Sequence, residues 1–407
     1  MQITNRFKSR INTAIAAGLV IAGATAGTVF AADPGVTDTE IVIGLHAPLS
    51  GPLVAFGQDP LQAAKMWYDE TNKKGGIHGR KIRVIAEDDK CNATEVGTLA
   101  RKFVTVDKVF LINGGSCTAS VVGAQEFVNR EKVPFVMLNA SGDPAVFPPT
   151  RYVFGAFPGS QGAIGAAIMG FSIDFLKGKR IAYIAHNDEY GGSNYGAAKA
   201  LADKKGIQIV AYERIAPGIT DVTAPILNVR AANPDVIISA AYPGPAVLIA
   251  QKLAEYGMKQ PVVQAVQGIP APEVFAKNVG NNEALKNFYY SAPLNDLANG
   301  PKQAKWVDMY KKAYPDRTIP SAFMAYGIAS AMAVTAALEK VGKDLTREKF
   351  VDAMENLKLD SGVMAAPFEF GKGRRDAFRA QSIFKFDGAK STLMPGVYTW
   401  DGSTAGK

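Results

Sequence analysis

The residues best suited to do chemistry form a short turn around two glycines, Asn113-Gly-Gly-Ser-Cys-Thr118. An apolar run that is typical of a buried strand, Val109–Ile112, precedes this turn. Thr118 and Ser120 then begin a segment whose apolar residues have helical spacing. Glycine lets a ligand approach the backbone, and the first N–H groups of a helix have no partner within the helix. A strand, a glycine turn and a helix in this order can bind an anion.

A carboxylate suits this turn better than a phosphate does. Phosphate-binding Walker loops continue from their glycines into Gly-Lys-Ser/Thr, and that tripeptide is missing here. The alternative is a tight turn closed by an ordinary helix cap. The turn by itself does not decide between these two interpretations.

Other chemically capable residues favour structural roles. His46, His78 and His186 share no metal-ligand spacing, so we expect each of them to be structural. Asp88 and Asp89 could form an acid/base pair, but a solvated strand end is the better interpretation. The chain has neither a Gly-x-Ser-x-Gly nucleophile elbow nor a dinucleotide-binding fingerprint. We therefore expect no enzyme, no cofactor and no metal site.

Residues 1–31 have the features of a secretory signal peptide. Arg6, Lys8 and Arg10 make a basic start, an apolar stretch of small residues follows at Ile11–Ala26, and cleavage is expected after Ala31. A membrane anchor is the alternative for this segment, and no later apolar run is expected to span a bilayer. Removing the three cations, and no acid, lowers the formal net charge from +8 to +5. This mild excess lacks the Lys/Arg stripe of a nucleic-acid binder.

The two cysteines of the chain are Cys91 and Cys117. In an exported protein, two cysteines most simply form one disulfide. Closing that loop stabilises the folded state by about 3 to 4 kcal/mol in the chain-entropy model. The bond would hold the glycine turn against the end of an earlier strand.

The elements that must position these residues alternate between strands and helices. The first series of expected strands is 41–45, 81–87, a strand from 109, and 133–138, with helices at 59–74, 94–106 and 118–130. The second series has strands at 180–185, 206–212, 235–240, 262–266 and 287–291, and helices at 191–204, 244–256, 301–314, 321–341 and 346–357. Strands separated by helices of about a dozen residues predict βαβ units and an α/β fold. A chain of 407 residues is long enough for two domains.

Several further motifs make the chain resemble the periplasmic leucine/isoleucine/valine-binding protein family. They are Ser50-Gly-Pro with Phe56-Gly57, Lys74-Gly-Gly-Ile with Gly79-Arg-Lys-Ile, Glu87-Asp-Asp-Lys-Cys91, the Gly-Gly-Ser-Cys117 turn, and Asp188-Glu-Tyr190-Gly. No single motif is decisive, but their order and spacing extend over about residues 39–400.

The resemblance implies a type I periplasmic-binding-protein fold. Two Rossmann-like lobes with parallel sheets would be joined by three crossover strands, near Gly155, Ala292 and Phe368. Lobe I would contain residues 32–155 and about 292–367, and lobe II would contain residues 156–291 and about 368–407. The two lobes would close around a ligand.

The resemblance also assigns ligand-binding residues. Thr118, which follows the second cysteine, would help to bind the carboxylate of the ligand. Backbone groups of Ala140 and Gly142 would assist it. From the second lobe, Tyr190 and Tyr242 would cover the ligand.

Two positions depart from the family pattern. Phe56 stands where a tyrosine is common, so one polar contact is lost. Gln267 stands where an acidic residue binds an α-ammonium group, and it carries no charge. Asp143 could replace that acid, although turn chemistry also explains an aspartate in Ser-Gly-Asp-Pro. We therefore favour an aromatic or other apolar carboxylate without an α-amino group over a branched-chain or aromatic amino acid.

The resemblance implies a transport function. The expected protein is a monomeric, periplasmic solute-binding protein that delivers its small-molecule ligand to a membrane ABC permease, without nucleic acid or cofactor. A soluble ligand-sensing receptor component is an alternative of another class. An exported hydrolase is a third, and turnover of a bound ligand would reveal it.

Overall fold

The computed structural model describes residues 33–51, 53–155, 161–266, 269, 271–294, 301–316, 322–377 and 379–399. The expected signal peptide and Gln267 lie outside these residues. The fold described below is that of the unit Ala32–Lys407.

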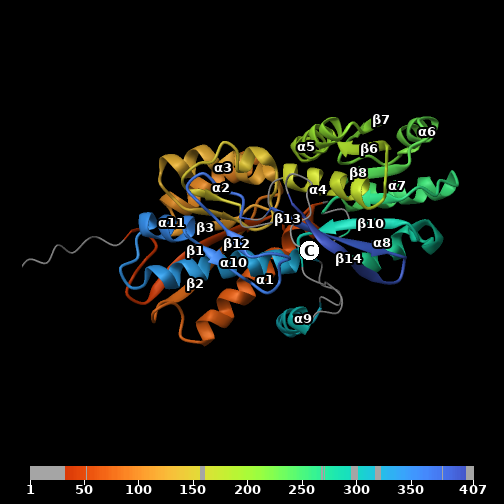
Figure 1. Cartoon of the computed structure of the whole chain (residues 1–407). Coiled ribbons are helices and arrows are strands. Elements are labelled where there is room, and N and C mark those ends of the chain that lie inside the picture. The colour runs from red at the N-terminus through yellow and green to blue at the C-terminus, as the bar shows by residue number, and fades with distance from the viewer. Residues whose placement is uncertain are drawn as a thin grey trace, which may run out of the picture. The chain divides into compact units, whose positions relative to one another are not determined.

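The first sheet has five parallel strands in the order β2-β1-β3-β4-β5 (Figure 1). Its strands are β1 (Glu40–Ala47), β2 (Lys81–Asp88), β3 (Leu111–Gly114), β4 (Phe135–Met137) and β5 (Val153–Phe154). Successive side chains of β1 alternate between two apolar clusters, with Ile41 and Ile43 in one and Val42 in the other. Both faces of this sheet are therefore covered, as in other parallel sheets.

Helices on the two faces of this sheet contribute to those two clusters. They are α1 (Val54–Lys73) and α10 (Ala322–Val341) in one cluster, and α2 (Ala93–Thr105) and α3 (Thr118–Arg130) in the other, and α11 (Arg347–Glu355) adds to the first. By length and composition α10 could cross a membrane, contrary to the expectation that no later run is long enough. However, 78% of the 18-residue apolar stretch of α10 is buried inside the molecule, as in the core helix of a globular protein.

The second sheet has seven strands in the order β14-β13-β10-β9-β8-β6-β7. Its strands are β6 (Arg180–His186), β7 (Gln208–Ile215), β8 (Val236–Ala240), β9 (Val262–Gln264), β10 (Phe288–Ala292), β13 (Ala380–Phe386) and β14 (Ser391–Thr399). The helices that follow its strands or precede them are α4 (Gln161–Asp174), α5 (Glu189–Lys205), α6 (Thr223–Ala231), α7 (Pro243–Glu255) and α8 (Pro272–Val279). The remaining elements are α9 (Pro301–Ala313) and the two-stranded sheet of β11 (Lys358–Leu359) and β12 (Phe368–Glu369).

The expected α/β fold is confirmed, with one difference in the second sheet. Its strands β6 to β10 pair in parallel, but β13 and β14 pair antiparallel, so this sheet is mixed. The short turn at Asp387-Gly388, where Gly388 has a φ of 94°, accounts for the antiparallel pairing of β13 with β14. A turn of this length can join only antiparallel strands. Of these two strands, β14 lies at the edge of the sheet and β13 lies between β10 and β14.

Most expected elements lie within three residues of the observed ones, but α1 begins five residues earlier than expected. Pro60 lies inside this helix and has no N–H group to donate to the carbonyl oxygen of Phe56. The side-chain amide of Asn139 donates to that oxygen instead, at 3.2 Å. Phe56 is therefore on a helix, and the hydrogen bond from Asn139 connects the first turns of that helix to the segment after β4.

The chain passes between the two sheets after β5, after β10 and before β13. At the first passage the N–H group of Gly155 donates to the carbonyl oxygen of Arg375 at 2.7 Å. At the second passage Leu294 forms a bridge with Met364. These places correspond to the expected crossings, while the division into two lobes stays a prediction.

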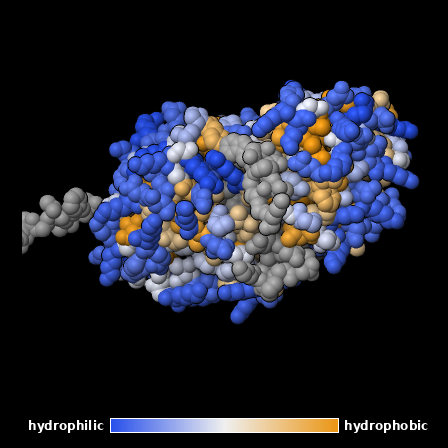
Figure 2. Space-filling model, viewed as in Figure 1, coloured by the Kyte–Doolittle hydropathy of each residue, from blue (hydrophilic) through white to orange (hydrophobic). Residues whose placement is uncertain are grey.

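The surface is mainly polar where it is displayed. Figure 2 shows hydrophilic residues over most of that face, with hydrophobic residues in small separate areas. The large apolar side chains are mostly in the core, and the exposed ones, such as Val106 and Phe175, are scattered along the sequence.

Candidate functional site

A cavity of about 250 Å³ contains most of the residues expected to bind ligand. Elements associated with the first sheet contribute Leu53, Phe56, Cys91, Ser116, Cys117, Thr118, Ala119 and Ser141. Elements associated with the second sheet contribute Asp188, Glu189, Tyr190, Pro217 and Tyr242. The carboxyl ends of parallel strands meet at this edge, which is where α/β folds place their ligands.

The start of α3 forms one end of the cavity. Thr118 and Ala119, the first two residues of the helix, line it, and Cys117 provides no side-chain cap. The hydroxyl oxygen of Thr118 accepts a hydrogen bond from the N–H group of Gly142 at 3.0 Å. A Cβ atom at Gly142 would lie 2.3 Å from that oxygen, so only glycine allows this approach. An uncapped helix start beside hydroxyl groups is suited to a carboxylate.

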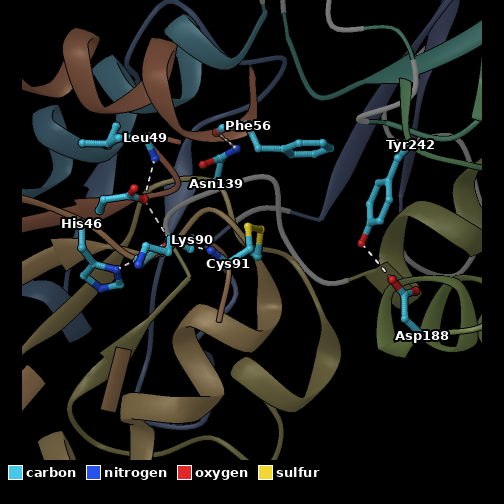
Figure 3. Close-up of a disulfide and its surroundings, with 11 residues drawn as sticks. His46, Leu49, Phe56, Lys90, Cys91, Asn139, Asp188 and Tyr242 are labelled. Carbon is cyan, nitrogen blue, oxygen red and sulfur yellow. Dashed lines mark hydrogen bonds and ion pairs between the residues drawn. A yellow bond between two sulfur atoms is a disulfide. The ribbon is translucent and has the colours of Figure 1, made fainter. Parts of the chain in front are cut away.

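Aromatic rings form the walls of the cavity. The rings of Phe56 and Tyr242 both line it and contact each other edge to face, with centroids 5.3 Å apart (Figure 3). Tyr190 stacks on Tyr242 at 4.9 Å, and its hydroxyl donates to the carbonyl oxygen of Val266 at 2.9 Å. Burial raises the pKa of Tyr190 well above its ordinary value, so this phenol is neutral at physiological pH.

Hydrogen bonds from His186 and Asp188 hold Tyr242 in place. Its N–H group donates to Nε2 of His186 at 2.8 Å, and its hydroxyl donates to Oδ2 of Asp188 at 3.1 Å. Burial lowers the pKa of His186, and the nearby Asp188 partly opposes this shift. The imidazole is therefore neutral, with Nδ1 as the donor to the carbonyl oxygen of Ile215 at 3.3 Å.

The expected disulfide joins Cys91 to Cys117, with Cα atoms 5.6 Å apart. Asp89 supports it, because one carboxylate oxygen accepts from the N–H group of Cys91 at 2.8 Å. The other carboxylate oxygen lies 2.8 Å from Nδ1 of His46 on β1 (Figure 3). The expectation of a solvated strand end is therefore wrong for Asp89, which is fully buried. A buried carboxylate needs such partners, and His46 has the expected structural role.

Four of the seven predicted ligand-binding residues line the cavity together: Phe56, Thr118, Tyr190 and Tyr242. Ala140 and Gly142 are not in the lining, and their N–H groups donate to Gly115 and Thr118 within the protein. Their contact with ligand stays a prediction, as does that of Gln267, which lies outside the described residues.

Asp143, which could replace the acid that the family has in place of Gln267, has a partner within the protein. Asp143 is not in the lining, and its carboxylate accepts from the N–H group of Gly162 at 3.1 Å, at the start of α4. This contact is with a helix start 19 residues further along the chain, so it differs from the local turn chemistry expected for Ser-Gly-Asp-Pro.

Sequence reasoning missed four polar residues of the lining: Ser116, Ser141, Asp188 and Glu189. The hydroxyl of Ser116 is buried and has no hydrogen-bond partner among the described residues. Its position inside the glycine turn was a feature of the sequence that could have indicated a place in the lining. Asp188 belongs to a motif that was recognised for Tyr190 alone. Within the described ranges, no group of three or more His, Cys, Asp and Glu side chains could hold a metal ion.

Comparisons with known proteins identify a family and a fold. A model described as periplasmic binding protein matches residues 40–390. Leu/Ile/Val-binding protein homolog 3 of Brucella melitensis is 26% identical over 304 residues, which are 74% of this chain and 80% of that protein.

Two solved structures are similar in fold. The branched-chain amino acid transporter substrate binding protein LivJ from Streptococcus pneumoniae, in complex with isoleucine, has a TM-score of 0.75 at 22% identity. The match covers 88% of this chain and 99% of that one. An ABC transporter solute binding protein from R. palustris, in complex with benzoate, has a TM-score of 0.75 at 17% identity, covering 87% of this chain and 95% of that one.

Proposed function

The chain belongs to the periplasmic binding protein family, and on that premise we propose that it captures a small carboxylate for an ABC importer. The observation that carries this proposal is the cavity in which the uncapped start of α3 and Thr118 lie with the rings of Phe56, Tyr190 and Tyr242. A periplasmic location follows from the family, and we include cleavage after Ala31 in the proposal.

The preferred ligand is a small carboxylate with an aromatic or other apolar body. A cavity of about 250 Å³ is at or below the usual size for drug-like ligands, so the solute is small. Aromatic rings in the ligand would gain about 0.5 to 1.5 kcal/mol per ring pair from stacking on the walls. Branched-chain or aromatic amino acids are the alternative ligands.

Capture is proposed to involve closure of two lobes. Segments near Gly155, Leu294 and Phe368 would bend, and the aromatic residues of the second sheet would cover a carboxylate held by α3. A membrane permease would then receive the ligand from the closed form, with one protein molecule binding one ligand.

A thermal-shift screen against amino acids and aromatic acids tests the function. A ligand at 100 times its Kd stabilises the native state by about 2.7 kcal/mol, which raises the Tm measurably. Calorimetry with 3-phenylpropionate and phenylalanine then compares the two ligand classes. Failure of every carboxylate to raise the Tm, or turnover of a bound compound, would contradict the proposal.

A further inference from the structure

Two acids line the cavity, Asp188 and Glu189, and Asp188 is the one that a hydrogen bond joins to a residue of the cavity wall. One carboxylate oxygen accepts from the N–H group of Gly191 at 3.0 Å and thereby caps α5. Capping alone requires one oxygen. The other oxygen accepts from the hydroxyl of Tyr242, a residue of the cavity wall, at 3.1 Å.

The carboxylate of Asp188 can accept further hydrogen bonds. An ionised carboxylate has about four lone-pair sites, and two printed contacts leave about two of them free. The cavity lining includes no Lys or Arg, and within the described residues no salt bridge involves Asp188. A negative group beside apolar rings gains most from an additional donor, because its solvation is reduced there.

The opposite end of the cavity gives a second, independent indication of a ligand. The hydroxyl of Ser116 is 2% exposed and has no partner among the described residues. Buried polar groups are normally hydrogen-bonded. A carboxylate at the start of α3 would provide the missing acceptor, next to Thr118.

We propose that the ligand has two polar ends: a carboxylate bound by Ser116, Thr118 and the start of α3, and a hydrogen-bond donor bound by Asp188. Its apolar body lies between them, against Phe56 and Tyr242. The donor is a hydroxyl on the far side of the apolar body, because the α-ammonium group of an amino acid is on the carbon next to the carboxylate and cannot reach the other end. This inference rests on the proposed function and specifies the ligand class.

Calorimetry on the wild-type mature protein tests the inference with four probes of nearly equal size. They are 3-phenylpropionate, phenylalanine, 3-(4-hydroxyphenyl)propionate and 3-(4-methoxyphenyl)propionate. A hydrogen bond to a charged group corresponds to about tenfold or more in affinity. We expect 3-(4-hydroxyphenyl)propionate to bind at least tenfold tighter than 3-phenylpropionate, and the methoxy compound to show no such gain. A gain for phenylalanine alone would show that the donor lies beside the carboxylate and would contradict the contact with Asp188.

The variant Asp188→Asn assigns the gain to this residue. Asparagine is also a good N-cap, with its carbonyl oxygen on the N–H group of Gly191, and its amide can then donate to the hydroxyl oxygen of Tyr242, so the fold is retained. We expect the ratio of the affinities for 3-(4-hydroxyphenyl)propionate and 3-phenylpropionate, both measured on this variant, to fall to within about twofold. Asp188→Ser, which also caps helices, repeats the test if the first variant does not fold.

Asp221→Asn is the matched control. Asp221 likewise accepts one backbone N–H and one hydroxyl, both from Thr223, at 2.9 and 2.6 Å, but it is exposed and outside the cavity lining. This variant should keep the wild-type order of affinities. Equal affinities for all four probes, or an undiminished preference in Asp188→Asn, would overturn the inference but leave the proposed function standing. Absence of binding by all four probes would overturn the inference, and failure of every carboxylate in the thermal-shift screen would overturn the proposed function as well.

Discussion

At the scale of single residues, the substitution Ser116→Ala should change the affinity for ligand without lowering the stability of the protein. Its hydroxyl is buried without a partner among the described residues, so Ser116→Ala removes no hydrogen bond within the described protein. The free energy of unfolding of the ligand-free protein should stay the same or rise slightly, as measured in urea. The affinity for a carboxylate, measured by calorimetry, should fall by about tenfold because a bond to a charged acceptor is lost.

Thr118→Val is the comparison for that experiment. The hydroxyl of Thr118 accepts from the N–H group of Gly142, so this change should lower both the stability and the affinity. An unchanged affinity in Ser116→Ala would show that Ser116 does not contact the ligand.

His186 should make the stability of the folded protein depend on pH. Burial lowers its pKa in the folded state, so below the ordinary value of about 6.5 the unfolded chain binds more protons than the folded one. This residue therefore lowers the stability as the pH falls below about 6.5, and it has no such effect at higher pH. Protonation would also remove the acceptor for the N–H group of Tyr242.

Urea unfolding between pH 5 and 8 measures that effect. His186→Gln keeps an acceptor for Tyr242 but does not titrate, so its stability should depend less on pH below about 6.5 than that of the wild type. Identical slopes for the two proteins would contradict the assignment.

At the scale of helices, one glycine determines how closely α1 and α10 pack. A Cβ atom at Gly327 would lie 2.0 Å from the carbonyl oxygen of Pro60, which is backbone and cannot move aside easily. Gly327→Ala should therefore destabilise the protein by about 1 to 3 kcal/mol, although alanine is the better helix former. It should also weaken ligand binding, because Phe56 stands on the first turns of α1 and stacks on Phe323 of α10.

Gly196→Ala provides the control for this prediction. Gly196 is on an exposed position of α5, and its Cβ atom would have no neighbour within 4 Å. This change should be neutral or stabilise by up to about 1 kcal/mol. Denaturant midpoints and m values of both variants decide the matter, and a neutral Gly327→Ala would show that the two helices can separate at no cost.

At the scale of the whole mature protein, ligand binding should reduce the radius of gyration. The chain passes between the two sheets at a few short segments, so bending there can change the distance between the sheets while each keeps its internal packing. Small-angle scattering with saturating ligand measures this change. Thr118→Val at the same ligand concentration should respond less, and an unchanged radius at calorimetric saturation would contradict closure.

Local patterns in the sequence were sufficient for the fold class and for most of the elements. Helices with a polar and an apolar face are recognised by their periodicity. Helix α4 was missed because it is buried on nearly all sides, so its sequence has no polar stripe. The earlier start of α1 was missed because Pro60 normally marks a helix start, and the amide that replaces its donor comes from Asn139, far along the chain.

For the site, the sequence by itself determined the glycine turn, the paired cysteines and the aromatic residues, because each is identified by residue type and local order. Only the tertiary structure decided that Asp89 is buried against His46, that the hydroxyl of Ser116 has no partner among the described residues, and that Asp188 lies on the cavity wall. These properties depend on burial and on partners contributed by other elements. The physical reason is that a side chain's type shows which bonds it can form, whereas folding decides which of those bonds are left for a ligand.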